Sequence, residues 1–422
     1  MTVASASRRS RQRLLDYFHQ RQTAMVEMIR QFATLETPST VPAAQQPLLN
    51  RLTKALEQRG MRVRRLAGQR TGGHLLAVPA SRPVPRSPQQ PIQLMLGHCD
   101  TVWPLNTLST MPLKQTSDKL HGPGVYDMKT GLVMMLFALE ALQSLDLTPR
   151  VSPLVLINSD EEIGSFESTR HVRRLAKVCD RTLVLEPSLG PSGHLKTARK
   201  GVGRFTIEVT GQAAHAGLDP EKGASAILEL SFIIQTLFKL NDPQEGITVN
   251  VGTIDGGLRS NVIAPTSRAE VDVRVFNPDD AERIEQTILG LRPTTPGTQL
   301  IIKGRIGRPP LERTPRNRQL WQLAQATAHD LGFAIAEGTA GGGSDGNTTS
   351  LYTATLDGLG AVGDGAHAPH EFIYLAPLIE RTALLTKLLL APPLVPQSAE
   401  TSELSPDSKH QQQDTRQQDY KR

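Results

Sequence analysis

The feature that most constrains this chain is an apolar segment that ends in a histidine and an aspartate, Leu94-Met-Leu-Gly-His98-Cys-Asp100. Its apolar residues follow one another without alternation, which predicts a strand buried on both faces, as in a parallel α/β sheet. His98 and Asp100 then lie at the carboxyl end of that strand, where such sheets bind their ligands. An imidazole close to a carboxylate suits a metal ligand and its orienting partner, although a simple polar pair is the commoner case.

Apolar strands and helical segments alternate along most of the chain. The sequence predicts strands at 62–66, 75–78, 92–96, 153–157 and 182–185, and helices at 12–32, 45–59, 130–145, 167–175, after 315 to about 331, and 375–390. Beyond residue 200 the predicted strands alternate apolar and polar residues, at 205–209, 248–251 and 269–275, around helices at 224–240 and 279–289. We therefore expect an α/β fold with a mainly parallel mixed sheet and flanking helices, plus an inserted α+β sandwich.

This pattern divides the chain into two domains, which its length of 422 residues also favours. The α/β domain comprises residues 1–199 and 313–392, and the inserted α+β domain comprises residues 200–312. A segment rich in Pro, Ser and Arg at 79–91 is expected on the surface. Residues 393–422, rich in Pro, Ser, Gln and charged residues, are expected to form a disordered tail.

Composition argues against several classes of protein. The net charge is +6, but the basic residues are spread along the chain and aromatic residues make up only 4%. We therefore expect the charge to favour small anionic substrates, or merely solubility, rather than a nucleic acid. No apolar run is long enough to cross a bilayer, and the basic N-terminus lacks the apolar core of a secretory signal. The two cysteines, Cys99 and Cys179, provide no disulfide framework. A cytoplasmic protein without a membrane partner is therefore expected.

Four further segments present acidic or histidine side chains where a strand or a Gly-rich turn ends. Asp127 precedes a predicted helix and, taken alone, is most simply an N-cap. Glu161 and Glu162 follow a predicted strand, where adjacent carboxylates repel each other unless a cation neutralises them; a solvated acidic loop is the alternative. Glu186 follows the next strand, and His367 lies in a Gly-rich turn. Together with the first histidine, these groups are the donor set that suits paired zinc ions.

These five clusters, in this order and at these separations, resemble the co-catalytic zinc exopeptidase and amidohydrolase family. That family includes acetylornithine deacetylase, succinyl-diaminopimelate desuccinylase, aminoacylase and glutamate carboxypeptidase, and the resemblance covers residues 12–390. It implies two divalent metal ions, with zinc preferred and cobalt or manganese as alternatives. It also implies the role of each residue: His98 and Glu186 bind one metal, Glu162 and His367 bind the other, Asp127 bridges them, Glu161 is the general base, and Asp100 orients His98.

The inserted domain resembles the lid of the same family through Gly211-Gln-Ala-Ala-His215-Ala-Gly217. The resemblance implies a homodimer in which His215 reaches the partner's site and polarises the scissile carbonyl. Asn261 and Arg274 match positions that bind a substrate carboxylate, and Gly342 lies in a glycine turn that lines the substrate pocket. Without the resemblance, His215 would be a turn residue and Arg274 an exposed charge on a strand.

Two details near the ligands also follow from the resemblance. The peptide bond between Asp127 and Met128 is expected to be cis. His370 is expected to be a neighbour of the ligand His367, directly before the glutamate of the last helix.

The expected activity is enzymatic hydrolysis of an amide or peptide bond adjacent to a free carboxylate, in an N-acyl amino acid or a peptide. Two zinc ions would polarise a water molecule, and Glu161 would take its proton as the hydroxide attacks the carbonyl. The two Gly-rich motifs favour the glutamate carboxypeptidase branch of the family. An N-acyl-amino-acid deacylase is the alternative within the same chemistry, and a non-catalytic dimerisation or binding module is the alternative of a different class.

Overall fold

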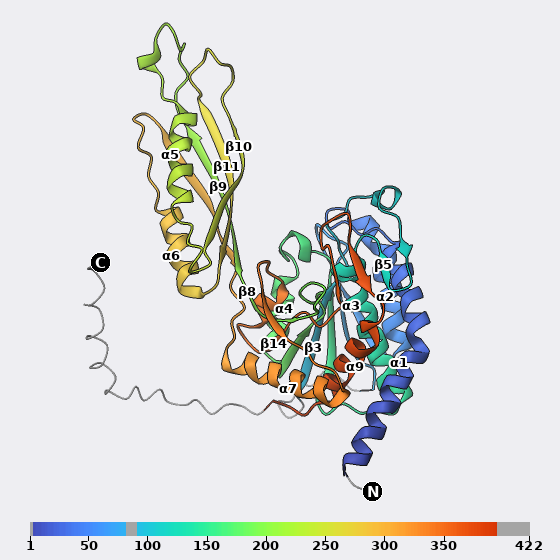
Figure 1. Cartoon of the computed structure of the whole chain (residues 1–422). Helices are drawn as coiled ribbons and strands as arrows, with labels where there is room; N and C mark the ends of the chain where they lie inside the picture. The colour runs from blue at the N-terminus through green and yellow to red at the C-terminus, as the bar shows by residue number, and fades with distance from the viewer. Residues whose placement is uncertain (1–2, 82–90, 395–422) are drawn as a thin grey trace, which may run out of the picture.

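A computed structural model describes residues 3–81 and 91–394 of the chain. These residues form a large α/β body and a narrower extension, which we call the insert and define as residues 201–308, from its first strand to its last. The insert projects from the body (Figure 1). The predicted fold class is confirmed, whereas the exact domain boundaries at 200 and 312 stay a prediction.

The body is built around a six-stranded mixed sheet. In spatial order its strands are β1 (Met61–Leu66), β2 (His74–Pro79), β6 (Ser152–Asn158), β3 (Ile92–His98), β7 (Arg181–Val184) and β14 (Ala354–Leu356). The last four are parallel to one another, and β1 and β2 join by antiparallel pairings. The carboxyl ends of β6, β3 and β7 therefore lie side by side at one edge of the sheet.

Helices cover both faces of this sheet. They are α1 (Val3–Ala33), α2 (Pro42–Gln58), α3 (Thr130–Ser144), α4 (Thr169–Ala176), α7 (Pro315–Leu331) and α9 (Pro377–Leu390). Strand β3 shows why its sequence is apolar throughout. Met95 packs into the large core that includes α1, α3 and α9, whereas Leu94 and Leu96 point to a smaller core with Val172 of α4. Both faces of the strand are thus buried, as the unbroken apolar run predicts.

The insert has its own sheet and its own hydrophobic core. Its antiparallel strands, in spatial order, are β10 (Thr248–Gly256), β11 (Thr266–Val275), β9 (Gly201–Thr210) and β12 (Gln299–Arg308). Helices α5 (Ala226–Phe238) and α6 (Pro278–Leu289) pack on one face, where Phe205, Ile207 and Val209 of β9 contribute to the core. Apolar and polar residues therefore alternate along β9 because one face of the sheet packs against the helices and the other face is not covered by them.

The structure contains several elements that the sequence analysis did not predict. They are β12 and the short elements β4 (Lys114–Gln115), β5 (Lys119–His121), β8 (Leu195–Arg199), β13 (Glu337–Ala340), α8 (Asp345–Thr349), β15 (Gly363–Asp364) and β16 (Phe372–Tyr374), as well as β14 of the main sheet. Most are too short to show a period, and the apolar pattern of β12 is broken by glycines and basic residues. Helix α1 also begins earlier than expected, at Val3.

Two expectations fall partly outside the described residues, namely the surface segment at 79–91, of which 82–90 are not described, and the tail, of which 395–422 are not described. Among the residues that are described, no helix combines the length and apolar character needed to cross a membrane.

Candidate metal centre

The five predicted ligands come together at the carboxyl edge of the central sheet. His98 is the last residue of β3, the Glu161–Glu162 pair follows β6, and Glu186 follows β7. Asp127 reaches the same place from the turn before α3, and His367 reaches it from the loop between β15 and β16. Because β6, β3 and β7 are parallel neighbours, the loops that follow them meet at one edge.

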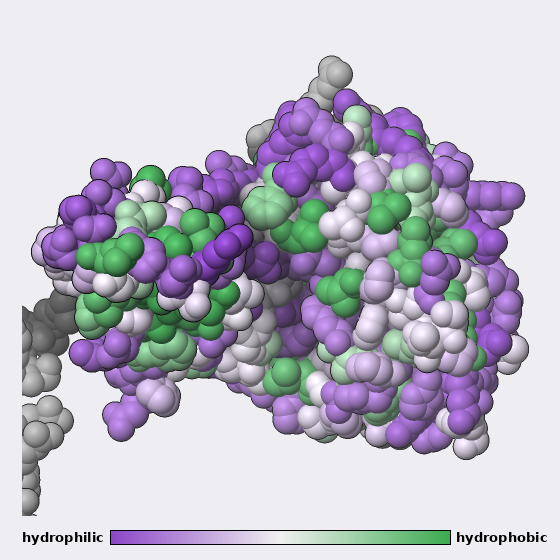
Figure 2. Space-filling view, turned by 90° about the horizontal axis from the view of Figure 1, so that it is seen from above, coloured by the Kyte–Doolittle hydropathy of each residue, from purple (hydrophilic) through white to green (hydrophobic). Residues whose placement is uncertain are grey.

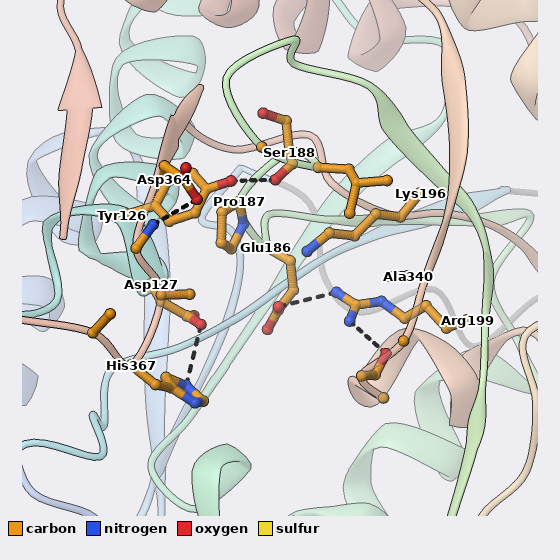
Figure 3. A pocket seen from close by; sticks show the side chains of 18 of the residues that line it. Tyr126, Asp127, Glu186, Pro187, Ser188, Lys196, Arg199, Ala340, Asp364 and His367 are labelled. Carbon is orange, nitrogen blue, oxygen red and sulfur yellow. Dashed lines mark hydrogen bonds and ion pairs between the residues drawn. The ribbon is translucent and has the colours of Figure 1, made fainter. Parts of the chain in front are cut away.

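Asp127 lies between the two histidines. Its Oδ1 is 3.2 Å from His98 Nε2, which is also 3.3 Å from Glu186 Oε1. Its Oδ2 is 3.5 Å from His367 Nε2, which is also 3.0 Å from Glu162 Oε2. The side chains therefore form two groups, one around each histidine, that share the two oxygens of a single carboxylate. Figure 3 shows Asp127 beside His367, with Glu186 nearby.

The donor atoms of these groups fit divalent cations. His98 Nε2, Asp127 Oδ1 and Glu162 Oε1 are buried and have no hydrogen-bond partner within the described part of the chain. In a tetrahedral site with metal–ligand bonds of about 2.0–2.2 Å, ligand atoms lie about 3.3 Å apart. The four nitrogen–oxygen distances above fall around that value, and two of them, 3.3 and 3.5 Å, are long for hydrogen bonds. Side-chain oxygens of Glu161 and Glu186 also lie within 4.8 Å of each other and of a His98 nitrogen.

Asp100 connects two of the ligand-bearing loops. His98 Nδ1 is 3.0 Å from the backbone oxygen of Asp100 and 3.5 Å from its Oδ1. The buried Asp100 carboxylate accepts hydrogen bonds from Ser39 Oγ (2.7 Å) and from the backbone N–H groups of Glu161 (3.3 Å) and Glu162 (3.2 Å). Asp100 therefore lies where the orienting role expected of it can be exercised.

Burial and repulsion shift the protonation of the acidic groups. Burial raises the pKa of Glu161 to about 8, although the nearby Arg308 guanidinium opposes the shift. Burial and the Asp127 charge raise the pKa of Glu162 to about 7. Hydrogen bonds to Asp127 and Glu162 raise the pKa of His367 to about 11. Several shifted pKa values within one cavity are typical of a functional site.

A cavity of about 530 Å³ opens beside these residues. It is lined by Asp127, Glu161, Glu162, Glu186 and His367, and on its other sides by Tyr126, Ser188, Lys196, Arg199, the glycine turn 341–343 and His370 (Figure 3). Gly342 thus lies where a substrate-binding residue should be. His215, Asn261 and Arg274 are not among the residues that line the cavity.

Those three residues lie within the insert. The exposed His215 is in the loop after β9 and pairs with Val262 through a β-bridge, and Ala216 N donates to Asn261 O (3.1 Å). Arg274, on β11, binds Asp272 through two hydrogen bonds of 2.7 and 2.9 Å. Within one chain, the structure therefore places the segment of His215 beside the segment of Asn261 and leaves Arg274 with a neighbour on its own strand.

Residues 94–391 match the family described as Peptidase family M20/M25/M40. The chain belongs to this family. It is accordingly a metal-dependent hydrolase that acts on amide bonds, as the sequence predicted.

Relatives of this M20 peptidase include carboxypeptidase G2 of Pseudomonas sp. (strain RS-16), which is 27% identical over 302 residues, covering 70% of this chain and 73% of that protein. Acetylornithine deacetylase of Klebsiella pneumoniae (strain 342) is 30% identical over 204 residues, covering 43% of this chain and 49% of that protein. A solved M20 family metallo-carboxypeptidase from Sulfolobus solfataricus has a TM-score of 0.68 at 16% identity and covers 88% of this chain and 98% of that one. At that identity the similarity shows the fold.

Two arginines of this M20 peptidase were missed by the sequence analysis. Arg308, the last residue of β12, contacts Glu161 Oε1 and donates to Glu161 O (2.8 Å) and Ser165 Oγ (3.0 Å). Arg199, at the end of β8, binds Asp357 (2.7 Å), Glu186 Oε2 (3.0 Å) and Gly342 O (3.0 Å). No spacing along the chain indicates these contacts, because they join segments far apart in the sequence: Arg308 links the insert to the body, and Arg199 links separate segments of the body.

Glu371 was also missed as a supporting residue. Its buried carboxylate accepts hydrogen bonds from the backbone N–H groups of Gly124 (2.9 Å), Tyr126 (2.8 Å) and Asp127 (3.1 Å), and from Trp103 Nε1 (2.9 Å). These bonds fix the turn that carries Asp127, where the expected cis peptide to Met128 is present. The expectation that this glutamate belongs to the last helix is wrong: it precedes β16, because α9 begins only at Pro377.

We predict that Glu371→Gln weakens metal binding. The amide NH₂ cannot accept the N–H bonds that one carboxylate oxygen now accepts, so the turn of Asp127 loosens. We expect metal affinity to fall by roughly 10- to 100-fold and the free energy of unfolding to fall by about 1–3 kcal/mol. Chelator competition and chemical denaturation measure both, with Glu380→Gln on the exposed face of α9 as control. Equal metal affinity in the two variants would contradict the proposed support.

Proposed function

We propose that this peptidase holds two zinc ions and hydrolyses an amide bond adjacent to a free carboxylate, in the manner of a carboxypeptidase. One metal would be held by His98 and Glu186, the other by Glu162 and His367, with Asp127 shared. The observation that carries the proposal is the position of Asp127, whose two oxygens face different histidines. A carboxylate with one oxygen toward each group is suited to bridging two cations.

Bound divalent cations would act as Lewis acids, lowering the pKa of a water molecule and polarising the carbonyl of the substrate. Glu161 lines the cavity next to the His98 and Glu186 ligand atoms and is not one of the five assigned ligands, so its carboxylate can accept the water's proton and deliver it to the leaving amine. Arg308 supports this role because its guanidinium holds the Glu161 side chain in place. Asp100 acts as a positioning residue through His98.

An N-acyl-amino-acid deacylase would use the same residues. The two Gly-rich motifs favour the carboxypeptidase, whereas the sequence matches cover 70% of this chain for either activity: 302 residues for carboxypeptidase G2 and 315 for a succinyl-diaminopimelate desuccinylase, each 27% identical. A non-catalytic module is less consistent with a site in which the base and all five ligands converge. The free and buried state of Cys99 and Cys179 supports our proposal that the enzyme works in the cytoplasm.

We predict that the enzyme releases amino acids from N-acyl amino acids and from dipeptides with a free C-terminus. Because the free carboxylate would be bound by the enzyme, substrates with a C-terminal carboxamide should show kcat/KM lower by roughly 10-fold or more. A panel of matched acids and amides, followed by release of the free amine, measures this. Equal rates for acids and amides would reject the carboxypeptidase proposal.

We predict that the two adjacent glutamates have different roles. Glu161→Gln should keep two metal ions per chain but lose roughly 100-fold or more in kcat, the size of a general-base effect. Glu162→Gln should lose one metal, because an amide is a poorer ligand than a carboxylate. Elemental analysis and steady-state kinetics test this, with exposed Glu57→Gln of α2 as control. Swapped phenotypes would reverse the assignment, and one metal per fully active wild-type chain would remove the bridged site.

We also propose a homodimer formed through the insert. Large apolar residues are exposed on α5 and around the edge strand β10, namely Ile227, Leu228, Phe232, Ile254 and Leu258. Figure 2 shows hydrophobic residues gathered on the surface of the insert, at the left of the view. An edge strand beside exposed apolar residues suits a second copy of the chain. The same arrangement would give His215 a role, since it lies outside the cavity of its own chain.

We predict that His215→Ala and Glu161→Gln subunits are each nearly inactive but complement each other. In a mixed dimer, one site combines an intact Glu161 with an intact His215 of the partner subunit. Up to half of one wild-type dimer's activity should therefore return after co-refolding, with native mass spectrometry to count mixed dimers. Confirmed mixed dimers without recovered activity would show that His215 does not act across the interface.

A further inference from the structure

Lys196 lies at the wall of the cavity, and its ammonium group has no partner among the described residues. It lies on β8, is only 8% exposed, and lines the same space as Glu186 and Arg199. Its backbone N–H bonds to Asp357 O (2.8 Å), but within the described residues its Nζ makes neither a hydrogen bond nor an ion pair. In Figure 3 its side chain reaches from β8 toward the interior of the cavity.

The other cations near the cavity are already engaged. Arg199 is bound to Asp357, Glu186 and the backbone oxygen of Gly342. Arg308 is bound to Glu161 and Ser165. A buried ammonium without a partner is costly, so a residue of this kind is retained where something negative binds it. Lys196 therefore has three N–H donors available to a ligand.

The space beside Lys196 can receive such a ligand. A side-chain carbon added to Gly341 or Gly342 would meet nothing within 4 Å, so the glycine turn leaves the opposite wall open. The remaining charged residues of the lining, Asp364 and His370, are exposed. Apart from Asp364, each lining carboxylate belongs to the proposed metal groups or is the proposed base.

We propose that Lys196 binds a carboxylate of the substrate. The proposal rests on the proposed function and names one residue, within the same chain, that recognises the free carboxylate. The ligand class is an N-acyl amino acid or a peptide whose carboxylate enters the cavity with the scissile amide. Lys196 is then a specificity residue, whereas Arg199 and Arg308 position other side chains.

The test compares Lys196→Met with Lys196→Arg on three substrates: an N-acyl-glutamate, its α-carboxamide, and the corresponding N-acyl-glutamine. We expect Lys196→Met to raise KM for the diacid by roughly 10- to 100-fold, the usual loss for a charge-assisted hydrogen bond. Each of the two amides lacks one of the two carboxylates of the diacid. The amide whose KM changes little lacks the carboxylate that Lys196 binds, and so identifies that carboxylate. Lys196→Arg should restore much of the affinity, and Lys54→Met on the exposed face of α2 is the control.

The rival role for Lys196 is to offset the negative charge of Glu186 and Asp127. It predicts a loss of metal and an equal fall in kcat for all three substrates after Lys196→Met, which would overturn the proposal. Calorimetric binding of N-acyl-glutamate in the Glu161→Gln background adds a measurement without turnover. Unchanged affinity on addition of Lys196→Met would overturn the carboxylate site, whereas a wild-type enzyme that binds but never hydrolyses these compounds would instead reject the proposed function.

Discussion

Asp127, Glu161, Glu162 and Glu186 place four carboxylates around one cavity at the edge of the central sheet. Negative charges so close together repel strongly where water is scarce. Arg199 and Arg308 each offset one of these charges, on Glu186 and Glu161. Among residues 3–81 and 91–394, buried atoms of His98 (Nε2), Asp127 (Oδ1) and Glu162 (Oε1) nevertheless have no hydrogen-bond partner. Protons on Glu161, Glu162 and His367 reduce this repulsion, as their raised pKa values indicate, and divalent cations would reduce it further.

The loops that carry these charges are held by carboxylates placed outside the ligand groups. Asp100 accepts the backbone N–H groups of Glu161 and Glu162, and Glu371 accepts that of Asp127. Asp160 accepts the N–H groups of Glu167 and Ser168 just beyond the glutamate pair. A carboxylate that takes two or three amide hydrogens keeps a turn closed, because backbone donors buried without partners would be costly. The backbone N–H groups of the ligand-bearing loops thus hold these loops in place against the repulsion between the ligand carboxylates.

Sequence reasoning located what is encoded locally. An unbroken apolar strand followed by a charged residue identifies both a buried strand and the group at its end, so His98, Glu161, Glu162 and Glu186 could be found without coordinates. Contacts between distant segments carry no such signal: Arg308 meets Glu161 across 147 residues of chain. The unpaired state of Lys196 is likewise visible only when its surroundings are known. For His215, Asn261 and Arg274, the resemblance named residues that the geometry of a single chain leaves outside the cavity.

The two halves of the centre differ in their access to solvent. The His98 side chain is 2% exposed and is fixed at the end of a central strand, whereas that of His367 is 51% exposed. His367 also has a φ of 63°, an uncommon conformation for a non-glycine residue that a Gly-rich turn helps to accommodate. The cavity therefore opens on the His367 side, and a substrate would meet that histidine before the buried group. A rigid strand thus holds the inner half of the centre, while a turn at the surface completes the outer half.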